Sequence, residues 1–169
     1  ENPADPQTAL LLGHAHLWTV TARARLDAPD PTITDHLVLA DSYFEEAYRL
    51  APDDARIIGW LGSARISLGD IRGDSVLAAR GLALLRESVR RRPAFNHFTA
   101  GFVLTGYPRE SAAFAEGLDH LWRNVDVCSG ERDASAEAYT AALRAEGACA
   151  NSPKAPHNYE GFMLTLGDA

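Results

Sequence analysis

The chain has 169 residues, of which 46% are hydrophobic and 23% are charged, and its formal net charge is −7. The length suffices for one domain with a hydrophobic core, and the composition argues against wholesale disorder. An acidic chain repels phosphate backbones, and no basic run is longer than Arg90-Arg91-Arg92, so we expect no nucleic-acid partner.

Apolar residues at helical spacing predict a series of helices along the chain. The predicted helices are 8–25, 35–52, 55–68, 75–91, 96–104, 108–125, 134–146 and 156–166. Asp53 is the expected cap of the third helix and Gly69 its expected stop. No segment alternates apolar and polar residues for long enough to predict a strand, so the predicted fold class is all-α.

Two features of the chain predict export, and a third argues against a membrane-spanning helix. The longest apolar runs, such as Ala9-Leu10-Leu11-Leu12, are far shorter than the roughly 20 residues of a membrane-spanning helix, so no transmembrane segment is expected. Residues 1–7 form a polar, proline-containing lead, typical of a mature end left by signal-peptide removal or of a trimmed chain. Two cysteines, an even count, suit an oxidising compartment. We therefore expect a periplasmic or secreted protein.

Cys128 and Cys149 flank the predicted helix 134–146. That helix is roughly 18 Å long at about 1.5 Å per residue, and the extended segment before it could run back along this length. A disulfide between the two cysteines is therefore predicted, with two unpaired, partly buried thiols as the alternative.

Over residues 35–93, small, large and turn-forming residues recur at fixed offsets. One helix carries Ala40, Phe44, Ala47 and Pro52, and a later helix repeats this spacing with Gly81, Leu85, Ser88 and Pro93. Between them, Ile58-x-x-Leu61-Gly62-x-x-Arg65 resembles the pattern W-x-x-L-G-x-x-Y of tetratricopeptide repeats, which are helix pairs of about 34 residues. Pro52 to Pro93 is 41 residues, which is longer than that period, and the excess lies around 71–74.

The resemblance implies antiparallel helix pairs stacked as a short TPR-like α-solenoid. Gly62 and Ala47 are expected where helices approach closely, and Phe44 and Leu61 are expected to fill the space between units. We predict a single domain over 1–169. Within it, 35–93 holds the clearest units and 94–169 holds degenerate ones.

The resemblance also implies a surface that binds a protein or peptide, lined mainly by the first helices of the units. The matched positions in this chain include Arg56, Ser63, Ile66 and Ser67. Arg56 and Arg65 are candidates for a partner's carboxylates, with solvated surface arginines as the simpler alternative. The carboxylate clamp that some family members use is not matched, because Gly59 and Ser63 occupy two of its positions.

A second candidate region is the start of the last predicted helix. His157, Asn158 and Glu160 lie where backbone N–H groups are unsatisfied, so they could bind a ligand or simply cap the helix. A small enzyme with its site at 149–160 is the least favoured hypothesis, because the chain has no G-x-S-x-G elbow, C-x-x-C motif or phosphate loop.

Six histidines raise an alternative of a different class, a helical metal- or haem-binding protein. The candidate ligands are His16, His97, His120 and His157. His14 and His16 are two residues apart and face different sides of a helix, whereas helical zinc sites use spacings of about three or four. The favoured prediction is therefore a non-catalytic, exported, TPR-like scaffold without a cofactor, with homo-oligomerisation through the last helix as a further possibility.

Overall fold

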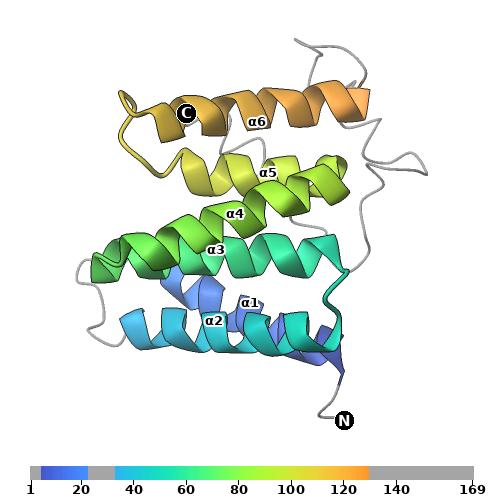
Figure 1. The fold of residues 1–169 in the computed structure, drawn as a ribbon, viewed down its shortest axis with the longest axis vertical. Coiled ribbons are helices and arrows are strands. Elements are labelled where there is room, and N and C mark those ends of the chain that lie inside the picture. The colour runs from blue at the N-terminus through green and yellow to red at the C-terminus, as the bar shows by residue number, and fades with distance from the viewer. Residues whose placement is uncertain (1–4, 23–32, 130–169) are drawn as a thin grey trace. The chain divides into compact units, whose positions relative to one another are not determined.

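The computed structural model describes residues 5–22 and 33–129, and all regular structure within them is helical (Figure 1). The helices are α1 (Pro6–Ala22), α2 (Ile33–Leu50), α3 (Ala55–Arg72), α4 (Ser75–Arg91), α5 (Pro93–Leu104) and α6 (Ala112–Ser129). The predicted all-α class is confirmed. The helices predicted at 134–146 and 156–166 lie outside the described residues, and the stacking as a solenoid stays a prediction.

The chain divides into two compact units, Glu1–Ser88 and Val89–Ala169. The single domain expected from the sequence stays a prediction. In the part of the chain that the structure describes, no helix is both long and apolar enough to cross a membrane.

The ends of α3 differ from the expected ones. Asp54, not Asp53, caps its start, because the Asp54 side chain accepts a hydrogen bond from the Arg56 backbone N–H. The helix continues past Gly69 and ends at Gly73, whose φ of 66° is the left-handed conformation that glycine adopts readily. The residues around 71–74 therefore form the end of α3 and the turn that leads into α4.

The hydrophobic core of the first unit lies between α1, α2 and α3. Its members include Leu10, Leu17, Leu37, Ala40, Phe44, Ala47, Ile57, Leu61, Ala64 and Leu68. Phe44 and Leu61 are fully buried, as predicted. Gly13 of α1 lies against the Phe44 ring, so a larger residue at this position would collide with that ring.

Helices α3 and α4 pack backbone against backbone. A Cβ atom at Gly62 would lie 2.7 Å from the carbonyl oxygen of Gly81 and 2.8 Å from the amide nitrogen of Leu85. The contact is reciprocal, since a Cβ at Gly81 would lie 2.7 Å from the carbonyl oxygen of Gly62. Gly69 makes the same kind of close contact further along α3, because a Cβ there would lie 2.6 Å from the amide nitrogen of Ala78 in α4. The role predicted for Gly62 is confirmed, and Gly69 is a contact residue instead of a helix stop.

In the second unit, α5 packs against α6 by the same means. Gly117 of α6 lies so close to the end of α5 that a Cβ there would be 2.8 Å from the Leu104 Cβ and from the Thr105 amide nitrogen. Leu121 is fully buried and lies against Gly101 of α5. At each of these contacts, the absence of a side chain on a glycine of one helix leaves room for a larger side chain or the backbone of the neighbouring helix.

The α3–α4 contact gives a direct test. Replacing Gly62 by leucine, a good helix former, forces the two backbones apart, and we expect the free energy of unfolding to fall by about 2–3 kcal/mol. Ala83→Leu on the exposed side of α4 is the matched control and should stay within about 0.5 kcal/mol of the wild type. Urea unfolding followed by circular dichroism measures both. Equal stability of the two variants would contradict the packing.

Candidate functional site

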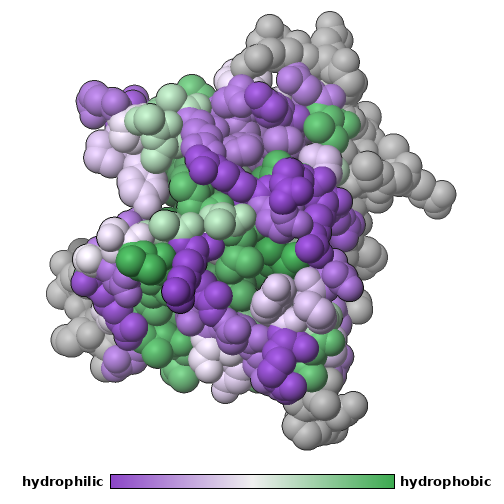
Figure 2. All heavy atoms as spheres, viewed as in Figure 1, coloured by the Kyte–Doolittle hydropathy of each residue, from purple (hydrophilic) through white to green (hydrophobic). Residues whose placement is uncertain are grey.

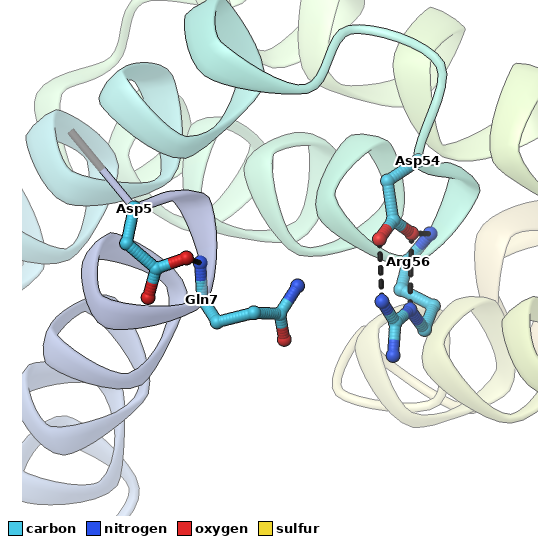
Figure 3. A network of polar contacts seen from close by, with 4 residues as sticks. All are labelled: Asp5, Gln7, Asp54 and Arg56. Carbon is cyan, nitrogen blue, oxygen red and sulfur yellow. Dashed lines mark hydrogen bonds and ion pairs between the residues drawn. The ribbon is translucent and has the colours of Figure 1, made fainter.

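Arg56 and Arg65, the two arginines expected to bind a partner's carboxylates, already pair with carboxylates of this chain. The Arg56 side chain donates hydrogen bonds to Asp54 from Nε at 3.0 Å and from Nη2 at 2.5 Å (Figure 3). Burial opposes ionisation of Asp54, but its hydrogen bonds with the Arg56 side chain and backbone lower its pKa. Asp5 caps α1 in a similar way, accepting from the backbone N–H of Gln7 at 3.3 Å (Figure 3). Arg56 therefore belongs to a helix cap.

Arg65 of α3 bridges to two acidic residues of α2. Its Nε donates to Asp41 Oδ1 at 3.3 Å, and its Nη2 pairs with Glu45. Burial raises the pKa of Asp41, although the charge of Arg65 partly opposes this rise. A partner's carboxylate would have to compete with these contacts, so Arg65 serves the α2–α3 packing first.

The remaining residues proposed on α3 do not form one open surface. Ser63 and Ile66 are each only 3% exposed, whereas Ser67 is half-buried. A partner docking on this conformation would therefore reach Ser67 sooner than Ser63 or Ile66.

Several predicted residues lie outside the described part of the chain. These are His157, Asn158, Glu160 and Cys149. Cys128 is in the last turn of α6, so the disulfide between Cys128 and Cys149 stays a prediction.

Helix α1 presents an apolar surface that the sequence analysis missed. From Pro6 to Ala22 the helix has no Asp, Glu, Lys or Arg, and it buries one side in the core of the first unit. On its other side Leu11 is 60% exposed, Leu12 42% and Trp18 60%; we call these residues the α1 strip. A surface helix normally has a charged or polar outer face. On the face of the molecule turned to the viewer in Figure 2, hydrophilic residues are accordingly interspersed among hydrophobic ones. The absence of charge over 17 residues was the available signal.

His14 lies among three aromatic rings of the first unit. Its ring stacks on Trp18 at 6.2 Å between centroids and meets Phe44 and Trp60 edge to face at 5.4 and 4.7 Å. Among the described residues, its Nε2 atom has no hydrogen-bond partner. Burial lowers the pKa of His14 to about 4, so its imidazole is neutral at physiological pH.

Four other histidines form two interhelical pairs. The Nδ1 atoms of His16 in α1 and His36 in α2 form a hydrogen bond of 2.8 Å, and so do those of His97 in α5 and His120 in α6; in each pair one ring donates its N–H and the other accepts. Of the histidines in the metal hypothesis, His97 and His120 are thus brought together, and His16 meets His36, which the hypothesis did not include. His157 lies outside the described residues. The register between two helices sets these pairs, so spacing within one helix could not reveal them.

The surroundings of His97 favour its neutral imidazole. Burial lowers the pKa of His97 to about 4, helped by the charges of His120 and Arg123 and opposed by Asp119. On the far side of the His120 ring, Nε2 is 3.9 Å from a carboxylate oxygen of Glu116. Residues 5–22 and 33–129 contain no group of three or more His, Cys, Asp or Glu side chains placed to hold a metal ion.

No protein-family model, curated protein sequence or solved structure matches the chain.

The burial of His14 predicts a pH dependence of stability. Its pKa is 6.5 in the unfolded chain and about 4 in the folded chain, so the unfolded state binds more protons as the pH falls from about 6.5 to 4. Stability contributed by neutral His14 is present above that window and is lost as the pH falls through it. Phenylalanine at position 14 keeps an aromatic ring but cannot take up a proton.

We expect the wild type to lose about 2–3 kcal/mol more stability than His14→Phe between about pH 7.5 and pH 4.5. Urea titrations of both proteins at the two pH values measure the difference, because the other titrating groups are common to both. The same pH dependence in the two proteins would contradict a buried neutral His14.

Proposed function

We propose that this protein is a non-catalytic, exported scaffold of TPR-like type that binds a protein or peptide partner. The observation that carries the proposal is the α1 strip, Leu11, Leu12 and Trp18 on a helix without a charged residue. Solvent-exposed apolar residues that gather on one side of an element are typical of protein-binding surfaces. Export rests on the even count of cysteines, Cys128 and Cys149.

The packing of the first unit supports a scaffold. Helices α2, α3 and α4 follow one another with small residues, Ala47, Gly62 and Gly81, at buried positions, as a helical-repeat stack requires. The solvent-facing side of a surface helix is normally polar, because it must stay hydrated. Helix α1 carries no charged side chain to provide this polarity, so a partner that covers the face would replace it.

The chemistry of the α1 strip indicates the kind of partner. Leu11 and Trp18 are seven residues apart, so they share one side of α1 over two helical turns. An amphipathic helix with apolar anchors at similar spacing fits such a surface. Complete burial of a Leu-sized side chain contributes roughly 1.5–3 kcal/mol, so two or three anchors provide a useful part of a binding energy. The strip takes the place of the α3 residues in this proposal, because Ser63 and Ile66 are buried.

The test compares capture by two surface variants. Immobilised wild type and a Leu11→Ser/Trp18→Ser variant are incubated with an envelope extract of the producing organism. The retained proteins are quantified by mass spectrometry. Val76→Ser is the matched control, because Val76 on α4 is 61% exposed, as Trp18 is 60%.

We expect one partner that wild type and Val76→Ser retain equally and that the double variant loses at least about tenfold, which corresponds to roughly 1.4 kcal/mol. Circular dichroism checks that the double variant is folded. Retention of the partner by the folded double variant, or no specific partner for the wild type, would refute the proposal. A concentration-dependent mass that only the double variant loses would identify the partner as a second copy of the chain.

A further inference from the structure

Residues 89–109, at the start of the second unit, differ from the rest of the chain in charge. They include four arginines, Arg90, Arg91, Arg92 and Arg109, and no Asp or Glu, in a chain whose formal net charge is −7. The first three arginines are exposed and directly precede α5, and Arg109 is exposed in the loop that follows this helix. Positive charge therefore lies at both ends of α5.

The exposed side of α5 is aromatic. The helix has no Asp, Glu, Lys or Arg, and Phe95, Phe98 and Phe102 lie on one side of it because they are three and four residues apart. Phe102 is 39% exposed and the other two rings are half-buried; we call these three residues the α5 stripe. Ala100 and Leu104, away from the stripe, are buried. The stripe is therefore the apolar surface that α5 offers to solvent.

The stripe and the arginines follow one another along the helix. The guanidinium carbon of Arg92 lies 5.8 Å from the centroid of the Phe95 ring, which is within the range of a cation–π contact. The ring centroids of Phe98 and Phe102 are 6.1 Å apart. Helix α5 is about 18 Å long at about 1.5 Å per residue, so cationic groups at its two ends lie far enough apart to contact separate anionic groups.

This composition indicates an anionic membrane surface as the partner. The phenylalanine rings have no hydrogen-bonding group, whereas a protein interface typically has about one hydrogen bond per 100–200 Å². Arginines beside apolar rings are typical of elements that lie in the membrane interface, because the rings enter the lipid while the cationic heads stay at its surface. Tyr107, which follows α5, is of a residue type enriched at this level of a bilayer. The α1 strip differs in this respect, since α1 has no arginine or lysine.

We propose that the second unit docks on an anionic lipid bilayer through the α5 stripe. The three rings enter the boundary between headgroups and acyl chains, about 5–10 Å deep, and the four arginines contact lipid phosphates. The acidic remainder of the chain does not prevent this docking, because salt screens charges separated by more than about 8–10 Å. The proposal is independent of the partner that the α1 strip binds, because the two surfaces belong to different units.

The test measures cosedimentation of the full chain with lipid vesicles. One set of vesicles is made of phosphatidylcholine alone, and the other also contains phosphatidylglycerol, which is anionic. Phe102→Ser removes the most exposed ring of the stripe, and the double variant Arg91→Gln/Arg92→Gln removes two of its charges. Circular dichroism checks that each variant is folded.

Matched controls come from the first unit. Ile71→Ser removes an apolar side chain of α3 that is 45% exposed, against 39% for Phe102. Arg49→Gln/Arg80→Gln removes two exposed arginines and so changes the net charge by the same amount as the α5 double variant. Both controls should bind vesicles as the wild type does.

We expect the wild type to bind the anionic vesicles at least about tenfold more tightly than the neutral ones, and to be released between about 0.05 and 0.5 M NaCl. Phe102→Ser should weaken binding at least about fivefold, and Arg91→Gln/Arg92→Gln at least about tenfold.

Absence of wild-type binding to the anionic vesicles overturns the proposal and leaves the stripe to a protein partner. Equal binding by the wild type and folded Phe102→Ser also overturns it, because the rings would then not enter the lipid. If Phe102→Ser is unfolded, the arginine double variant decides, and its binding at wild-type strength overturns the proposal.

Discussion

The first unit depends on the direct contact between the backbones of α3 and α4 at Gly62 and Gly81. Because neither residue has a side chain, the helices approach until a carbonyl oxygen of each lies 2.7 Å from where a Cβ of the other would be, too close for a side chain. Together with the core on the α2 side, this contact buries α3 over most of its surface. The polar groups of α3 consequently find partners inside the chain, as Arg65 does with Asp41. Exposed large apolar side chains lie instead on other helices, among them Leu11, Leu12 and Trp18 of α1.

The spacing of residues along the sequence predicted those features of the fold that depend on a single helix. Helical periodicity located the six helices of residues 5–22 and 33–129, and the small residue at Gly62 marked a close crossing. The same reasoning was wrong for Gly69, because glycine serves both close contacts and left-handed helix ends, and only the position of α4 distinguishes them. Burial of Ser63 and Ile66 likewise depends on the packing around α3. The histidine pairs depend on the register between helices, which no single-helix pattern contains.

Helix α1 carries both the α1 strip on its exposed side and His16, whose Nδ1 atom is hydrogen-bonded to that of His36 in α2. This interhelical bond holds α1 against α2 and so helps to fix the position of the strip. His97 and His120 link α5 to α6 in the same way.

Native-state amide hydrogen exchange tests the buried position of α3 most directly. Amides in a helix packed on several sides exchange only when the whole unit unfolds, whereas those of a helix with an exposed face also exchange through local opening. The account predicts that the amides of 61–66 in α3 are the slowest of the first unit and are clearly slower than those of α1. Exchange of 61–66 at the rate of α1 would contradict it.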